Sequence, residues 1–194
     1  MPHATNPSDG VRIYYEVEGS GAPLVLLHGT PGTFVTHWRQ WGYVTALSPD
    51  YRLILLDQRG HGRSDAPHKP QAYASDRRVG DVVAVLDELG IDQAHIWGYS
   101  MGGLTAFYMA MQAPDRVASL IIGGQGTSPI PEGAAEQWAQ RIRAGGAAWF
   151  VETWEEGLRA AGVALPEALR EELQNLDVEA QAAVASAFSR AGIA

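Results

Sequence analysis

The chain has 194 residues, of which 46% are hydrophobic and 19% charged, a composition typical of a globular protein with a sizeable core. Its net charge of −8 argues against nucleic acid or an anionic membrane as a partner. The chain contains no cysteine, which excludes a disulfide framework, a thiol nucleophile and a cysteine-based metal site. No leader-like segment and no membrane-spanning apolar window is present in the sequence, so a cytoplasmic protein is the expectation.

The first third of the chain alternates strand and helix patterns. Residues 11–19 are rich in β-branched and aromatic side chains and predict a strand. Continuous apolar runs at 23–27 and 51–56 are typical of strands buried on both faces of a parallel sheet. A short helix is predicted between these two runs, from apolar residues spaced by three: Trp38, Trp41, Val44 and Leu47.

The same alternation continues to residue 123. One apolar stripe over 76–89, followed by Gly90 at the position of a C-cap, predicts a helix. A strand ending at Trp97, a helix over 104–113 and a buried strand over 117–123 follow. Strands that alternate with helices indicate an α/β fold with a doubly wound, mostly parallel sheet, here assigned to residues 1–127. In such sheets ligands bind beyond the carboxyl ends of the strands.

The segment Gly98-Tyr-Ser-Met-Gly102 lies between a predicted strand and a predicted helix. Gly-x-Ser-x-Gly in this context is the nucleophile-elbow pattern, a sharp turn on which the serine side chain is exposed. The two glycines are needed because side chains at their positions would collide with the turn. The helix behind the turn directs its N-terminal amides at any negative charge that develops there. Ser100 is therefore the predicted nucleophile.

Residues 128–194 have a different composition, dominated by Ala, Glu, Gln and Arg, with no strand pattern. Four short helices are predicted from apolar spacing, the last of them N-capped by Asp177. One interpretation is a helical bundle that serves stability alone. The favoured interpretation is a helical cap, because the segment follows directly on the last predicted strand and carries aromatic residues suited to a substrate pocket.

Three motifs taken together resemble the α/β-hydrolase superfamily: His28-Gly-Thr-Pro-Gly32, Asp57-Gln-Arg-Gly-His-Gly-Arg-Ser64 and Gly98-Tyr-Ser-Met-Gly-Gly103. The resemblance extends over residues 11–128 and implies a hydrolase that forms an acyl-enzyme on Ser100. It also implies an oxyanion hole made by the backbone amides of Thr30 and Met101, each worth about 10²–10³ in rate.

The resemblance leaves the substrate open. His-Gly-x-Pro-Gly with Asp-Gln-Arg-Gly is similar to proline iminopeptidases, whereas the elbow is similar to carboxylesterases, enol-lactonases, carbon–carbon bond hydrolases and cofactor-free haloperoxidases. A small ester, lactone, amide or carbon–carbon bond substrate is the expectation. The residues predicted to line its pocket are His28, Tyr99, Gln125, Trp138 and Trp154. No cofactor or metal is expected, because no ligand spacing and no phosphate-binding glycine loop is present in the sequence.

The sequence departs from the superfamily in one respect. The family order is nucleophile, acid, histidine, but no histidine follows His95, and Gln125 occupies a loop in which some members carry the acid. His28 is expected to be a buried structural imidazole. His61 lies at the correct end of the sheet, in a loop that is structural in the family, and His95 lies at the wrong end. Asp57 is expected to hold the Arg59 loop. His3, His37 and His68 are predicted to be surface or loop residues.

The triad acid and histidine are therefore expected to be absent from this chain, which is interpreted as a C-terminally truncated hydrolase core with its cap. The strand at 117–123 would then be an apolar sheet edge, expected to be covered by another copy of the chain or by a complementary C-terminal fragment. Two alternatives remain: a catalytically inactive ligand-binding or interaction protein, and an active site completed by a partner chain.

Overall fold

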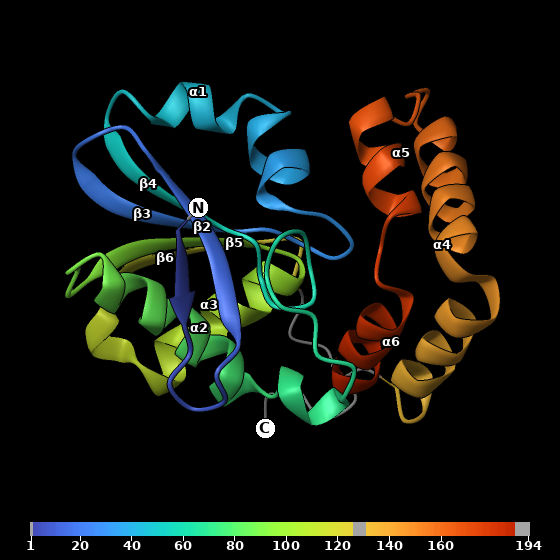
Figure 1. The fold of residues 1–194 in the computed structure, drawn as a ribbon. Helices are drawn as coiled ribbons and strands as arrows, with labels where there is room; N and C mark the ends of the chain where they lie inside the picture. Colours follow the sequence, from blue (N-terminus) through green and yellow to red (C-terminus); the bar gives the residue numbers. More distant parts are fainter. Residues whose placement is uncertain (1, 126–130, 189–194) are drawn as a thin grey trace. The chain divides into compact units, whose positions relative to one another are not determined.

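The computed structural model describes residues 2–125 and 131–188, which form two compact units (Figure 1). The first unit comprises residues 1–65 and 75–127, and the second comprises residues 66–74 and 128–194. The short segment 66–74 thus belongs with the C-terminal helices, although the sequence analysis grouped it with the sheet. Among the described residues, no helix is long and apolar enough to cross a membrane.

The first unit is built on a six-stranded sheet with the order β1-β2-β4-β3-β5-β6 (Figure 1). The strands are β1 (His3–Thr5), β2 (Arg12–Glu18), β3 (Ala22–Leu27), β4 (Tyr51–Leu56), β5 (Ala94–Tyr99) and β6 (Val117–Gly123). The four strands from β4 to β6 in this order are parallel, whereas β1 and β2 pair antiparallel. The mostly parallel doubly wound sheet is therefore confirmed. The three-residue strand β1 was not predicted, since it is too short to show a period.

The sheet registers bring the carboxyl ends of the central strands together. Leu27 at the end of β3 pairs with Leu56 at the end of β4 and with Gly98 near the end of β5. The loops after these strands carry the three sequence motifs. These loops therefore leave the sheet at the carboxyl ends of the strands, as expected for a parallel α/β sheet.

Helices cover both faces of the central strands. On one face lie α2 (Ser75–Glu88) and α3 (Met101–Gln112), with the short turn η3 (Pro114–Arg116) after α3 (Figure 1). On the other face lie η1 (Val35–Arg39) and α1 (Tyr43–Leu47). The helix predicted around Trp38 is thus two short turns, and only part of its apolar stripe is buried: Trp38 is 3% exposed and Trp41 57%. The left-handed Gly42 separates the two turns.

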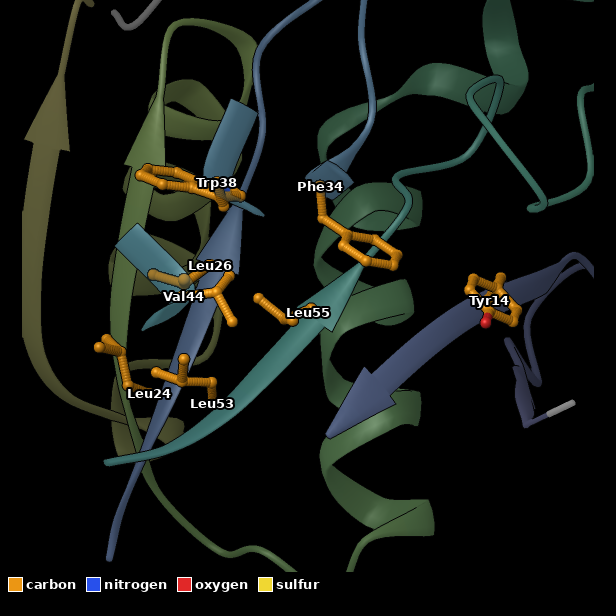
Figure 2. Close-up of a cluster of buried hydrophobic side chains, with 8 residues drawn as sticks. All are labelled: Tyr14, Leu24, Leu26, Phe34, Trp38, Val44, Leu53 and Leu55. Atoms are coloured by element: carbon orange, nitrogen blue, oxygen red, sulfur yellow. The ribbon is translucent and has the colours of Figure 1, made fainter. Parts of the chain in front are cut away.

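The core under η1 and α1 is a compact apolar cluster (Figure 2). Alternate residues of β3 and β4 point to this face because side chains alternate along a strand. Phe34, Trp38 and Val44 pack on them from the loop and the two turns. The strand members are Tyr14, Leu24, Leu26, Leu53 and Leu55. Full burial of such side chains is worth about 1.5–3 kcal/mol each, which fixes the loop after β3 against the sheet.

The strand β6 lies at the edge of the sheet, since among the described strands it pairs only with β5. Its Ile121 and Ile122 are 49% and 37% exposed, although neighbouring strands of a parallel sheet are normally covered. The edge carries no charged residue that would discourage pairing.

We propose that this edge is covered by another copy of the chain or by a complementary C-terminal fragment. The expected result is concentration-dependent association in sedimentation velocity, weakened by Ile121→Lys, because association would bury the lysine charge and a lysine on an edge strand opposes strand pairing. Ala46→Lys, in the exposed part of α1, is the matched charge control. A wild-type chain that stays monomeric at high concentration contradicts coverage by another copy, and one that also fails to bind an added C-terminal segment contradicts the proposal as a whole.

The second unit is helical. It contains η2 (Pro70–Tyr73), α4 (Ala134–Ala160), α5 (Glu167–Gln174) and α6 (Val178–Ala187). The two helices predicted around Trp138 and Trp154 are confirmed as the two halves of α4, which are separated by a kink at Gly146, whose φ of 58° and ψ of −152° are non-helical. Asp177 caps α6 as predicted, accepting a hydrogen bond from the Ala180 amide at 3.0 Å. Its other carboxylate oxygen lies 2.9 Å from Nε2 of His68.

Candidate functional site

Ser100 lies at the turn between β5 and α3, where the sequence predicted a nucleophile elbow. Its φ of 52° and ψ of −117° are strained, and Ser100 is the one non-glycine residue with positive φ among the described residues. Two backbone hydrogen bonds hold the turn: the Ser100 amide donates to Gly123 O at 2.8 Å, and the Leu104 amide donates to Ser100 O at 3.1 Å. Non-glycine residues persist in such conformations only where the surroundings impose them, which is frequent at active sites.

The glycines of the motif are required by close backbone contacts. A Cβ at Gly98 would lie 2.1 Å from Gly102 O, and a Cβ at Gly102 would lie 2.1 Å from Leu27 O. The helix α3 therefore approaches the ends of β3 and β5 more closely than any side chain allows. Met101 is the first residue of this helix, so its amide has no partner within the helix.

The loop after β3 passes directly beside the nucleophile. A Cβ at Gly29 would lie 3.1 Å from Ser100 Cβ and 3.3 Å from the Tyr99 ring. Thr30 follows in the same loop, and the Thr30–Pro31 peptide bond is cis. The structure thus brings the loop that carries Thr30 next to the turn that carries Ser100 and Met101.

His28 anchors this loop. It is fully buried, and both ring nitrogens are hydrogen-bonded: Nδ1 donates to Gly29 O at 2.8 Å, and Nε2 accepts from the Gln58 amide at 2.9 Å. Because Nε2 faces an N–H donor, it cannot carry a proton itself. Burial, together with the nearby His61 and His37, lowers the pKa of His28 well below its usual value. His28 is a neutral structural imidazole, as predicted, and its full burial does not fit the pocket-lining position that was also predicted for it.

His61 is also buried, and its ring is engaged away from Ser100. Its Nδ1 lies 3.1 Å from Arg59 O, and its Nε2 lies 2.9 Å from the Thr30 hydroxyl. A carbonyl can only accept, so Nδ1 carries the hydrogen and the Thr30 hydroxyl donates to Nε2. Burial lowers the pKa of His61 to about 4. Within the described part of the chain, no hydrogen bond joins an imidazole to the Ser100 hydroxyl.

His37 was predicted to be a surface or loop residue, and this is wrong in part. Its ring lies 6.0 Å from the His28 ring and 6.0 Å from the Tyr99 ring, measured between centroids, and it packs against Gly32. Burial lowers its pKa. Periodicity could not reveal this position, because His37 lies in a five-residue turn whose direction is set by tertiary packing.

Asp57 holds two loops together through backbone amides. Its carboxylate accepts from the Phe34 amide at 3.3 Å and from the Arg63 amide at 3.0 Å, which agrees with the structural role expected from the sequence. Burial raises the pKa of Asp57 to about 6. The folded protein therefore retains a proton on Asp57 at pH values where the unfolded chain, with a pKa near 3.8, has released it.

This shift gives a pH-dependent stability. The Asp57 contribution is fully present below about pH 4 and is lost as pH rises through about 6, because only the folded state still binds the proton there. We expect the free energy of unfolding of the wild type, minus that of Asp57→Asn, to fall by about 2–3 kcal/mol over this window. Urea denaturation at pH 4, 5, 6 and 7 measures it. A difference independent of pH contradicts the assignment.

The remaining predicted site residues lie as follows. Tyr99 is 47% exposed beside Ser100. Gln125 is exposed, and its Cβ lies 3.1 Å from the position of a Cβ built on Gly103. In the second unit, Trp138 and Trp154 are partly buried against the cluster that contains Ile142 and Phe150. Among the described residues, no group of three His, Asp or Glu side chains has the geometry of a metal site.

Comparison with known proteins agrees with this geometry. A family model described as alpha/beta hydrolase fold matches residues 22–178. The chain is 36% identical over 121 residues to epoxide hydrolase 2 of Siraitia grosvenorii, covering 62% of this chain and 38% of the relative. It is 39% identical over 132 residues to 2-hydroxymuconate semialdehyde hydrolase of Pseudomonas sp. (strain CF600), covering 66% and 46%. The chain thus spans less than half the length of these curated relatives.

A solved structure supports the same placement. The thermophilic esterase from Thermogutta terrifontis superposes with a TM-score of 0.82 at 26% identity, covering 97% of this chain and 71% of the esterase. The family model covers most of the chain, and both units contribute residues to the match. This protein therefore belongs to the alpha/beta hydrolase fold family.

Proposed function

We propose that this chain carries the nucleophile and the oxyanion hole of a serine hydrolase acting on a small ester, lactone, amide or carbon–carbon bond substrate. The observation that carries the proposal is the strained Ser100, held between Gly123 and Leu104 at the start of α3. A hydroxyl on such a turn stands clear of the sheet and lies beside the N-terminus of a helix.

The proposed oxyanion donors are the amides of Met101 and Thr30. Met101 begins α3, and a Cβ built on Gly29, the residue before Thr30, would lie 3.1 Å from Ser100 Cβ. Removal of one such donor costs about 10²–10³ in rate, so two of them account for several kcal/mol of transition-state stabilisation. Tyr99 and Gln125 are proposed to contact the substrate. That Trp138 and Trp154 also do so, from a helical cap over 128–194, stays a prediction.

The activation of Ser100 is the open part of the proposal. The rings of His28 and His61 are occupied by other groups, so neither serves as its base in this arrangement. Loss of a triad histidine costs about 10⁶ in turnover, and an oxyanion hole with substrate binding alone retains about 10³–10⁴ over water. We therefore propose that the acid and histidine are supplied from outside the 194 residues.

Labelling with a fluorophosphonate tests the proposal. The chain alone is expected to label at Ser100 slowly but above the Ser100→Ala variant, as measured by intact mass and peptide mapping. Addition of a C-terminal segment from a family relative is expected to raise the rate by several orders of magnitude. Rapid labelling by the chain alone would show that an internal base exists.

The alternative function is a catalytically inactive binding protein that retains the scaffold. The observation that favours it is that the rings of His28 and His61 are already hydrogen-bonded to groups other than Ser100. Under this alternative, the wild-type chain labels no faster than the Ser100→Ala variant, with or without an added segment. The same experiment therefore separates the two functions.

A further inference from the structure

The side chain of Gln58 connects the loop after β3 to the helix α3. This residue follows β4 at the start of the second motif and is 5% exposed. Its side-chain Nε2 donates to His28 O at 2.5 Å, and its Oε1 accepts from the Thr105 hydroxyl at 2.8 Å. The orientation of the amide is fixed by chemistry, because His28 O can only accept a hydrogen bond.

The two ends of this bridge lie on the two halves of the proposed oxyanion hole. His28 begins the loop that carries Thr30, two residues further on. Thr105 lies one turn into α3, and its hydroxyl is also 3.2 Å from the carbonyl of Met101, the first residue of the helix. Displacement at the His28 end would reach Thr30 over two residues, and displacement at the Thr105 end would reach Met101 through the contact between the Thr105 hydroxyl and the Met101 carbonyl.

We propose that Gln58 is a positioning residue, whose buried side chain sets the separation between the Thr30 loop and the start of α3. The inference rests on the proposed function, since the separation matters only if the Thr30 and Met101 amides bind one oxyanion. Oxyanion donors act at about 2.7–3.1 Å, and a misplacement of about 1 Å can cost 10² in rate. A bridge of two hydrogen bonds, shielded from water, holds such a distance because no solvent competes for its partners.

The test uses changes that remove the bridge while retaining shape. Gln58→Met keeps the length of the side chain. It also keeps the hydrogen bond from the backbone amide of residue 58 to His28 Nε2. Thr105→Val is isosteric and removes only the hydroxyl, whereas Thr105→Ser retains it. Gln93→Met makes the same chemical change as Gln58→Met before β5, at the opposite end of the strand from Ser100.

Saturation kinetics of fluorophosphonate labelling separate inhibitor binding from the chemical step. Gln58→Met and Thr105→Val are expected to lower the maximal rate of Ser100 labelling by about 10-fold or more, with the half-saturating concentration changed less than about twofold. Thr105→Ser is expected to restore the wild-type rate, and Gln93→Met to leave it unchanged. Unchanged rates in both bridge variants, or an equal loss in Gln93→Met, overturn the inference.

Amide spectra keep the inference separate from the proposed function. In ¹H–¹⁵N spectra, Gln58→Met and Thr105→Val are expected to shift both the Thr30 and the Met101 resonances, and Gln93→Met neither. If wild-type Ser100 fails to label above Ser100→Ala, the proposed function fails, and the amide shifts alone decide the bridge. Bridge variants in which both resonances stay unmoved refute the positioning role in either case.

Discussion

Replacing Gly102 by alanine is expected to destabilise the sheet-containing unit by about 4 kcal/mol or more, an effect large enough to unfold it. The added Cβ would lie 2.1 Å from Leu27 O, 2.5 Å from Leu27 C and 2.7 Å from His28 O. These are backbone atoms at the end of a fully buried central strand, so no side-chain rotation relieves the collision. The helix α3 would have to move away from β3, and the elbow would open.

Gly90→Ala is the matched control in the same unit. Gly90 has a φ of +64° and open space around its Cβ position. Alanine there is expected to lower the stability by about 1–2 kcal/mol, the cost of a non-glycine residue in the left-handed conformation. Thermal and urea denaturation of the two variants therefore separate collision from backbone strain. A Gly102→Ala variant no less stable than Gly90→Ala would mean that α3 does not approach β3 as closely as described.

Replacing Asp81 by asparagine is the second change with a large expected effect, a loss of about 3–5 kcal/mol. Asp81 on α2 accepts two hydrogen bonds of 2.6 Å from the guanidinium of Arg59, and the two side chains are 4% and 1% exposed. Asn6 donates to the same carboxylate at 2.8 Å. Without this carboxylate, the buried charge of Arg59 keeps, among the described residues, the ion pair with Asp9, whose side chain is 21% exposed.

The control for this change lies on the same helix. Asp87 pairs with Arg116 at 2.8 Å, but its side chain is 63% exposed. Asp87→Asn is expected to cost less than about 1 kcal/mol, because exposed ion pairs are screened by water. Urea denaturation at neutral pH compares the two. Equal losses of stability in the two variants would mean that the Arg59 network is not buried and does not hold the 57–65 loop.

The features of the site that could be predicted from the sequence are those with a local cause. Gly-x-Ser-x-Gly is a local pattern, and its strained turn was predictable because the cause is local: adjacent strand and helix signals with glycines where side chains collide. The buried strands were predictable for the same reason, since continuous apolar runs of this length are typical of parallel sheets. His28 could be assigned a structural role from its motif, although its two hydrogen-bond partners could not be named.

The contacts between distant segments were not predictable. The Asp57–Ser64 motif was recognisable in the sequence, but the role of Gln58 was not, because its partners His28 and Thr105 lie 30 and 47 residues away. The approach of His37 to Tyr99 was not recognisable either, since that depends on how a short turn packs on the sheet.

The amino-acid order alone determined most of the elements, the mostly parallel sheet and the turn that carries Ser100, since these depend on periodicity and on residues within a few positions of each other. Only the tertiary structure decided what surrounds Ser100: the loop of Thr30 at its side, and the imidazole of His61 turned to Thr30 instead of the serine. Strand order fixes which loops meet, and the hydrogen-bond partners fix which imidazole nitrogen carries a proton. Neither is encoded in any short window of the chain.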